Sequence, residues 1–374
     1  MAQYPFIPVN EPLLNGNEEN YLIECIRTGW ISSEGPFVKK FEEQFAARLG
    51  RCYGIAVCNG TAALDAVVLA LGIGPGDEII LPTFTIISCI AQIVRSGAKP
   101  VLVDCDPLTW NMDVTQIEQK ITPQTKAIMV VHVYGLPVDM EPIWALAEKY
   151  GLTIIEDAAE AIGQTYNGKA CGSLGHISTF SFYPNKHITT GEGGMIVTDD
   201  PVMADKCRSF RNLCFKPEQR FVHDELGWNL RLTNLQAAVG LAQLERLDEF
   251  VQIKRNIGTR YNELFADTLG LQLPLRKTPF AENIYWVYGI VLNVSSNFDA
   301  KEAMSRLAKL GIGTRPFFWP MHEQPVFRKM GLFLNDSHPV AERIARRGFY
   351  LPSGLALTDE QIERTFDAVL EILQ

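Results

Sequence analysis

The sequence lacks several features that would place it in a class of protein at once. Its 374 residues include eight cysteines, but no two are closer than six positions, so no Cys-x-x-Cys pair indicates a zinc knuckle or a redox centre. The longest uncharged stretch, 79–94, contains Pro82 and is shorter than the ~18 residues of a membrane span. The N-terminus has no apolar core of a signal peptide. We therefore expect a cytoplasmic protein with reduced cysteines and no membrane contact.

Positive charge is also scarce. There are 34 Lys and Arg residues against 43 Asp and Glu, a net charge of −9, and no basic run, so we expect no nucleic-acid partner. Neither the Walker phosphate-binding pattern nor a Gly-x-Gly-x-x-Gly turn after a strand occurs, which argues against nucleoside triphosphates and dinucleotides. The histidines at 132, 176, 223 and 338 have no metal-ligand spacing, so no metal site is predicted.

The first half of the chain alternates between two patterns. Short apolar, β-rich runs occur at 53–58, 78–81, 100–103, 126–133 and 152–156. Helical patterns precede or separate them, at 17–27, 37–49, 61–71, 85–96, 114–120 and 140–150. Strands that are apolar throughout and separated by helices predict an α/β fold, with a mostly parallel sheet covered on both faces.

The pattern changes in the second half. Two short strands are predicted close together at 177–183 and 194–198, and a long amphipathic helix begins at Thr233. Beyond it we expect a strand, 285–294, and helices at 300–310 and after the capping pair Thr358 and Gln361. We therefore predict an N-terminal arm and large domain over residues 1–250 and a smaller α+β domain over 251–374.

Two polar motifs follow predicted strands. Asp157 and Glu160 stand where the strand 152–156 ends, and ligands of open α/β sheets gather at the carboxyl ends of strands. A helix cap is an equally good interpretation of Asp157. Lys186 follows the apolar run 177–183 and precedes a glycine-rich turn, a desolvated setting that favours the free amine needed for imine chemistry. A lone lysine at a strand end is more often a solvated surface group.

A third motif, Cys58-Asn59-Gly60-Thr61-Ala62, joins a strand to a helix. Backbone amides at a helix N-terminus, together with the Thr61 hydroxyl, form a phosphate site. Taken alone, the motif favours a helix cap by Asn59 or Thr61. Taken together, the three motifs supply a phosphate site, a carboxylate for a pyridinium nitrogen and an amine for an aldehyde, which are the three anchors of pyridoxal 5'-phosphate (PLP).

Several longer segments resemble the DegT/DnrJ/EryC1/StrS family of sugar aminotransferases over nearly the whole chain. They include Gly29-Trp30-Ile31-Ser32, Ser181-x4-Lys186, Gly191-Glu192-Gly193-Gly194 and the run 227–238. The resemblance implies an aspartate-aminotransferase-like fold (PLP fold type I), whose large domain has a mostly parallel seven-stranded sheet, and a homodimer with shared active sites. The segments 188–195, 240–246 and 315–322 are similar to the branch that aminates GDP-4-keto-6-deoxymannose at C4, with L-glutamate as amino donor.

The resemblance also implies roles for individual residues. Lys186 would bind the cofactor aldehyde and carry a proton during transfer, and Asp157 would pair with the pyridinium nitrogen. Glu160 would lie beside the cofactor's 3′ oxygen. The phosphate would be held by Ser181, Thr61 and the amides of Gly60 and Ala62. Asn229 would reach the phosphate from the neighbouring subunit.

Two departures from the family pattern concern the cofactor ring and the sugar. Many relatives place an aromatic residue over the ring where this chain has Ile86, so either Ile86 or Phe84 would cover it. The residues around the lysine, Tyr183 and His187, also differ from the GDP-sugar branch. The side chains expected to contact the substrate are Trp30, Ser32, Tyr183, His187, Arg315, Phe318 and His322.

Alternatives remain open for these residues and for the activity. Trp30 is as compatible with a packing anchor, and Arg315 and His322 with structural bonds to loop carbonyls. The substrate could be another UDP- or dTDP-linked 3- or 4-keto sugar. A PLP-dependent sugar dehydratase is disfavoured, because such relatives replace the lysine with histidine. A non-catalytic regulatory protein on this fold is disfavoured by the presence of Asp157, Ser181 and Lys186.

Overall fold

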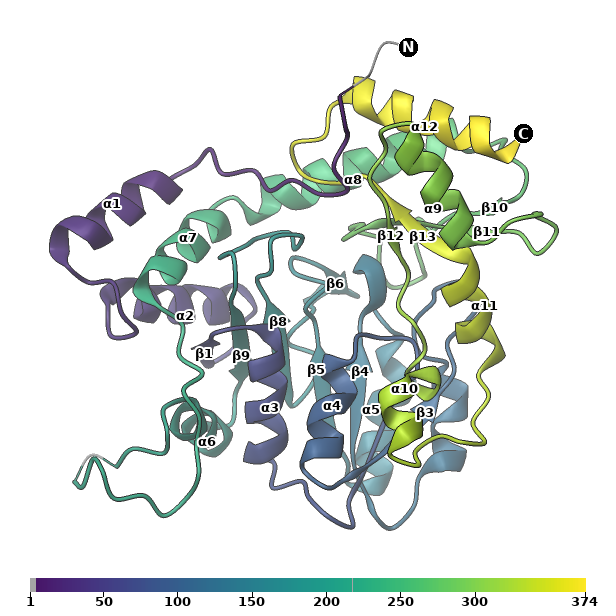
Figure 1. The fold of residues 1–374 in the computed structure, drawn as a ribbon. Coiled ribbons are helices and arrows are strands. Elements are labelled where there is room, and N and C mark those ends of the chain that lie inside the picture. Colours follow the sequence, from purple (N-terminus) through teal and green to yellow (C-terminus); the bar gives the residue numbers. More distant parts are fainter. Residues whose placement is uncertain (1–4, 217) are drawn as a thin grey trace.

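The computed structural model describes residues 5–216 and 218–374, and its centre is a seven-stranded sheet (Figure 1). The strands lie in the order β1-β9-β8-β5-β4-β2-β3. Their bounds are β1 (Tyr53–Val57), β2 (Glu78–Pro82), β3 (Lys99–Val103), β4 (Thr125–Val131), β5 (Thr153–Asp157), β8 (Ile177–Ser181) and β9 (Gly194–Thr198). Only β9 runs antiparallel to its neighbours, so the predicted mostly parallel sheet is confirmed.

Helices cover both faces of this sheet because its strands are apolar on both sides. In β4, Ile128 and Val130 face one core, whereas Ala127, Met129 and Val131 face the other. One face packs against α2 (Pro36–Arg48), α5 (Met140–Tyr150) and α7 (Asn234–Leu244). The opposite face packs against α3 (Gly60–Ala70), α4 (Ser88–Arg95) and α6 (Pro201–Arg211). The helix α1 (Glu18–Thr28) lies on α7.

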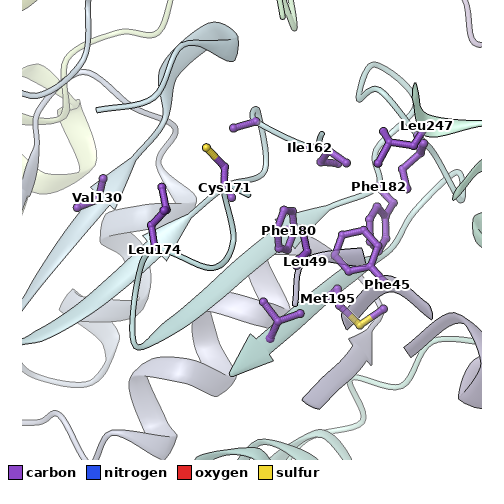
Figure 2. Close-up of a cluster of buried hydrophobic side chains, with 14 of the residues drawn as sticks. Phe45, Leu49, Val130, Ile162, Cys171, Leu174, Phe180, Phe182, Met195 and Leu247 are labelled. Carbon is purple, nitrogen blue, oxygen red and sulfur yellow. The ribbon is translucent and has the colours of Figure 1, made fainter. Parts of the chain in front are cut away.

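Aromatic rings fill the first of these cores beneath the strand that precedes Lys186. Phe180 and Phe182 stand next to Phe45 of α2, with ring centroids 4.8 and 5.3 Å from it (Figure 2). All three side chains are at most 1% exposed. This packing holds β8 and the residues that follow it in a fixed position. The backbone that carries Ser181 and Lys186 is therefore rigid.

A second sheet, β10-β11-β13-β12, lies in the C-terminal third. Its strands are β10 (Leu271–Gln272), β11 (Tyr288–Leu292), β12 (Arg315–Pro316) and β13 (Gly348–Leu351). Helices α8 (Leu247–Leu264), α9 (Ala300–Lys309), α11 (Pro339–Arg347) and α12 (Asp359–Leu373) surround it, and α10 (Pro325–Lys329) lies apart. The N-terminal arm reaches this unit, where Ile7 forms a bridge with Ile312. The domain boundary at residue 250 stays a prediction.

The remaining short elements are β6 (Thr165–Tyr166), which pairs with β7 (Lys169–Ala170), and four 3-10 turns. The turns are η1 (Val114–Gln116), η2 (Glu118–Lys120), η3 (Val133–Gly135) and η4 (Met321–Glu323). The prediction of a helix at 114–120 is therefore wrong, because this segment forms two 3-10 turns. No helix among the described residues is long and apolar enough to cross a membrane.

The amphipathic pattern that starts at Thr233 predicts one long helix, but the structure has two. Thr233 caps α7, in a reciprocal capping box with Gln236. The helical path breaks at Arg246, whose φ is −113°, and α8 then starts at Leu247. Apolar spacing is similar on either side of the break, so periodicity alone does not reveal it.

Candidate active site

A cavity of 460 Å³ opens at the carboxyl ends of the parallel strands. It brings together most of the residues singled out as cofactor ligands, which come from segments far apart in the chain. Its lining includes Asn59, Gly60, Thr61, Ile86, Ser88, Asp157, Glu160, Thr179, Ser181, Tyr183, Asn185, Lys186, Glu192, Trp286, Phe318 and Tyr350. The sheet topology explains why these residues lie together, because parallel strands end at the same edge of a sheet.

Lys186 lies in the turn after β8, and its side chain is 9% exposed. Burial lowers the pKa of its amino group, while the nearby carboxylates of Glu160 and Asp157 raise it. The nearest carboxylate oxygen, Glu160 Oε1, is 3.9 Å from Nζ. The face of the Trp286 ring is closer, with its centroid 3.6 Å from Nζ. This amine is therefore held in a desolvated place rather than in a tight ion pair, which favours its neutral, nucleophilic form.

Asp157 is the last residue of β5 and is 5% exposed. Its Oδ1 accepts a hydrogen bond from the Ala159 amide at 3.0 Å, and its Oδ2 accepts one from the Cys89 thiol at 3.2 Å. Burial raises the pKa of this carboxyl, while the Ala159 amide, the Cys89 thiol and the charge of Lys186 lower it in part. A positively charged ring nitrogen would supply the missing partner.

Glu160 lies on the same side of the cavity. Its Oε2 accepts a hydrogen bond from the Tyr134 amide at 2.9 Å, and the side chain is 6% exposed. Burial raises the pKa of this carboxyl to about 7. Glu160 therefore changes charge near neutral pH, next to Lys186.

The other end of the cavity is formed by the start of α3. Asn59 caps this helix, because its Oδ1 accepts the Ala62 amide at 2.8 Å, so the helix-cap interpretation of Asn59 is confirmed. The Ala62 amide, predicted to face a phosphate, is thereby engaged. The Thr61 hydroxyl lies 2.8 Å from Ser88 Oγ. A Cβ on Gly60 would lie 2.8 Å from Cβ of Ser181, so only glycine lets this turn approach β8 so closely.

These residues fit PLP chemically. Two polar atoms of the lining, Thr179 Oγ1 and Asn185 Oδ1, are buried without a hydrogen-bond partner among the described residues. Such atoms are rare in folded proteins unless a ligand or water satisfies them. The cavity also combines an amine, a carboxylate and, near a helix N-terminus, the hydroxyls of Thr61, Ser88 and Ser181, as the three anchors of PLP require.

Phe84 and Ile86 have different surroundings. Phe84 is fully buried and packs against Tyr134, Phe317 and Phe318, with ring centroids 5.8 to 5.9 Å apart. Ile86 is 44% exposed and lines the cavity. Of the two, Ile86 is therefore the one placed to touch a ligand.

The residues predicted to contact the substrate divide into three groups. Tyr183 and Phe318 line the cavity, and Arg315 is exposed beside it, paired with the lining residue Tyr350 across β12 and β13. His187 and His322 are buried outside the lining. The His187 ring lies 3.2 Å from the Ile284 carbonyl oxygen, and burial lowers its pKa to about 3.

His322 lies 2.8 Å from the Thr83 hydroxyl and 3.1 Å from Glu342 Oε1. Trp30 and Ser32 lie outside this cavity. Ser32 lines a second cavity of 520 Å³, and the Trp30 carbonyl accepts a hydrogen bond from Asn234 at 2.7 Å. Asn229 is exposed, bridged to Asn212. The structure thus does not bring these three residues to the cavity within one chain.

Several lining residues were not predicted from the sequence. Trp286 stands inside a predicted strand, where an aromatic residue indicates only core packing. Tyr350 stands in a segment with no predicted element. Cys89 stands inside an apolar helix pattern; it does not line the cavity but contacts the lining residue Asp157. No local signal distinguishes these residues, because each meets the site through the folding of a distant segment.

The comparisons with known proteins decide the family. The model of the DegT/DnrJ/EryC1/StrS aminotransferase family matches residues 12–370. The chain belongs to this family. It is 43% identical over 357 residues to a GDP-perosamine synthase of Escherichia coli O157:H7, with 96% of each chain covered. It is also 43% identical over 374 residues to a GDP-perosamine synthase of Caulobacter vibrioides, with 100% of each covered.

Among solved structures, this DegT/DnrJ/EryC1/StrS aminotransferase is similar to the PLP form of the putative sugar aminotransferase Spr1654 from Streptococcus pneumoniae. The TM-score is 0.89 at 26% identity, and 100% of both chains is covered. The predicted enzyme class, a PLP-dependent aminotransferase of fold type I, is therefore confirmed. The roles of individual residues stay predictions.

Proposed function

We propose that this enzyme transfers an amino group from L-glutamate to a nucleotide-linked 4-keto-6-deoxy sugar, with GDP-4-keto-6-deoxymannose as the substrate and GDP-perosamine as the product. The observation that carries the amino transfer is the position of Lys186, a desolvated amine in the same cavity as Asp157. The names of two relatives that are 43% identical over nearly the whole chain support the choice of sugar.

PLP, when bound, withdraws electrons from the carbon that gains or loses the amine. Lys186 would hold the cofactor through its amino group and then, once displaced by the incoming amine, carry a proton at Nζ. Burial lowers the pKa of this amino group, which favours the neutral amine that a base requires. Asp157 would keep the ring nitrogen protonated, since its carboxylate is buried and aimed by the Ala159 amide and the Cys89 thiol.

The phosphate would bind at the start of α3. The first amides of a helix have no intrahelical acceptor, and the Asn59 side chain accepts that of Ala62. The Ala63 amide makes the first regular helical bond, to the Asn59 carbonyl oxygen. The amides of Gly60 and Thr61 then remain for an anion, together with the hydroxyls of Thr61 and Ser181. We leave the Ala62 amide out of this site.

The sugar nucleotide would enter on the open side of the cavity, past Ile86, Tyr183 and Phe318. The Arg315 guanidinium, exposed beside Tyr350, would bind a phosphate of the nucleotide. His187 and His322 are left out of this proposal, because both are buried in contacts within the chain.

We also propose a homodimer in which Asn229 of one protomer completes the phosphate site of its partner. The segment around Asn229 supports this arrangement, since it exposes large apolar side chains: Phe221 is 80%, Leu226 86% and Trp228 46% exposed. Figure 1 shows the loop that follows α6 extending away from the sheet. Trp30 and Ser32 would act at the same subunit contact, outside the cavity of their own chain.

The proposed function is tested by product analysis. Purified enzyme loaded with PLP is incubated with L-glutamate and, in separate reactions, GDP-4-keto-6-deoxymannose and UDP- or dTDP-linked 3- and 4-keto sugars. We expect 2-oxoglutarate and an aminated GDP-sugar, identified by mass spectrometry. Amination of only a UDP- or dTDP-linked sugar would replace the substrate and keep the reaction.

A lysine variant tests the reaction itself. Lys186→Ala should reduce turnover by at least ~10⁴-fold, because it removes both the covalent anchor and the proton carrier. Lys169→Ala is the matched control: that lysine is exposed in β7 and lies outside the cavity, so its loss should leave turnover unchanged. Substantial turnover by Lys186→Ala would contradict the assignment.

A further inference from the structure

Trp286 contacts both Lys186 and the residue before it, Asn185. The residue precedes β11 and is 4% exposed. Its ring centroid lies 3.6 Å from Lys186 Nζ, and its indole Nε1 donates a hydrogen bond to the carbonyl oxygen of Asn185 at 2.7 Å. One side chain from the C-terminal third therefore contacts the peptide that leads into Lys186 and the amino group at its tip.

Trp286 is itself held from several sides. Lys254, buried in α8, donates a hydrogen bond from Nζ to the Trp286 carbonyl oxygen at 2.8 Å and another to the carbonyl oxygen of Ser353. The Tyr134 ring packs on the indole at a centroid distance of 5.8 Å. Gly135, at φ +97°, would place a Cβ 2.7 Å from the Trp286 amide nitrogen, so glycine is required there. The indole is thus fixed independently of any ligand.

The Lys186 side chain needs such a support. Its Nζ makes no hydrogen bond to any residue of 5–216 or 218–374, and the nearest carboxylate oxygen is 3.9 Å away on Glu160. Four rotatable bonds would otherwise let the amine sample many directions. The face of an aromatic ring is electronegative and attracts N–H groups. With an N–H toward Trp286, the lone pair of the neutral amine does not face the ring and is left for the cavity that both residues line.

We propose that Trp286 is a positioning residue for Lys186, which directs the lone pair of its amine toward the cavity while anchoring the Asn185 peptide. This role rests on the proposed function of Lys186 as the amine that captures PLP. In that capture the neutral amine adds to the aldehyde carbon, the C=N bond forms, and the aldehyde oxygen leaves as water. A misdirected lone pair slows this addition even when the cofactor phosphate is bound.

The test measures the capture rate rather than turnover. Full-length enzyme is stripped of cofactor and mixed with PLP in a stopped-flow instrument, and the rise of the visible band is followed at saturating PLP. Trp286→Phe keeps a ring face but loses the bond to Asn185, and Trp286→Leu loses both contacts. We expect the rate to fall roughly threefold in the first variant and on the order of tenfold or more in the second.

Trp144→Phe is the matched control. Trp144 also donates its indole N–H to a backbone carbonyl, that of Leu174 at 2.9 Å, but it lies in α5 outside the cavity. Its loss should leave the capture rate unchanged, whatever it does to thermal stability. A wild-type rate in folded Trp286→Leu would overturn the proposal as a whole, and a wild-type rate in folded Trp286→Phe would overturn the part of it that concerns the bond to Asn185.

The lysine variant separates the two proposals. If Lys186→Ala still develops the wild-type band with PLP, then the proposed function of Lys186 fails and the inference on Trp286 fails with it. If Lys186→Ala loses the band but both Trp286 variants capture PLP at the wild-type rate, only the positioning role is wrong.

Discussion

At the scale of single residues, the cavity holds an amine and a carboxyl group close together without a tight ion pair between them. Lys186 Nζ and Glu160 Oε1 are 3.9 Å apart. Burial lowers the pKa of the amine and raises that of the carboxyl to about 7, so both shifts favour the neutral form. Glu160 can therefore gain or lose a proton near neutral pH, and the shift at Lys186 favours the neutral amine that a proton carrier in transamination requires.

Cys89 is the residue whose importance is least visible in the sequence. Its thiol donates to Asp157 Oδ2 at 3.2 Å and lies 3.2 Å from the Thr85 hydroxyl. Cys89→Ala should lower kcat about tenfold and leave KM for the sugar nearly unchanged, because a hydrogen bond to a charged group that fixes the carboxylate is lost. Steady-state kinetics on the PLP-loaded enzyme measure both constants.

Cys207→Ala is the control for this prediction. Cys207 is also fully buried, in α6, but lies outside the cavity. Its replacement should leave kcat unchanged. Equal kinetics of Cys89→Ala and the wild type would show that the thiol does not help to position Asp157.

The site residues that could be predicted from the sequence are those that follow a recognisable strand within a few positions. Asp157 and Lys186 belong to this group, because the strand pattern fixes which end of the sheet they occupy. Ser181 lies within the predicted strand 177–183, and only the family resemblance indicates its role. Trp286 and Cys89 could not be predicted, since their contacts with Lys186 and Asp157 join segments about 70 to 100 positions apart.

At the scale of elements, α8 carries a buried lysine that links it to two loops. Lys254 donates to the carbonyl oxygens of Trp286 and Ser353, and burial lowers the pKa of its amino group to about 7. In the unfolded chain a lysine keeps a pKa of about 10.4. The unfolded state therefore binds more protons between these two values, so this group makes the folded state more stable as pH rises from 7.

Urea-induced unfolding at two pH values tests this linkage. Lys254→Met removes the titrating group, and the charges elsewhere stay the same. The free energy of unfolding of the wild type, minus that of the variant, should increase by about 2 kcal/mol between pH 7 and pH 9. A difference that is the same at both pH values would mean that Lys254 stays charged in the folded protein.

Elements were predictable where one local signal dominated. The bounds of α5 and β9 match the predicted 140–150 and 194–198 because a clear apolar pattern ends at a glycine or a polar residue in each case. The break between α7 and α8 was not predictable, since Arg246 continues a good helical sequence. It is fixed by tertiary contacts: Glu245 accepts hydrogen bonds from Tyr21 and Asn17 of the N-terminal segment.

At the scale of the whole molecule, the proposed active site needs two chains. Lys186 and Asp157 line the cavity of one protomer, whereas Asn229 is exposed and does not line it. If each active site takes residues from both subunits, two inactive variants should restore activity when their subunits mix, which is not expected of a site formed by one chain.

Subunit mixing tests the shared site. Lys186→Ala and Asn229→Asp are each expected to be nearly inactive, the second because its carboxylate repels the phosphate. After joint unfolding and refolding at equal amounts, about a quarter of wild-type activity should return, since half of the dimers are mixed and each has one intact site. Separately refolded Lys186→Ala and Asn229→Asp, combined only afterwards, are the control. Failure of the mixed sample to exceed that control would contradict a contribution of Asn229 across the dimer.

The central claim is that Lys186 and Asp157 serve amino transfer to a GDP-linked keto sugar. A two-step absorbance titration tests it most directly. L-Glutamate should bleach the visible band of the PLP-loaded enzyme, and after its removal GDP-4-keto-6-deoxymannose should restore the band with stoichiometric formation of the amino sugar. Bleaching without restoration would contradict the GDP-sugar substrate, and a band that glutamate does not change would contradict glutamate as the amino donor.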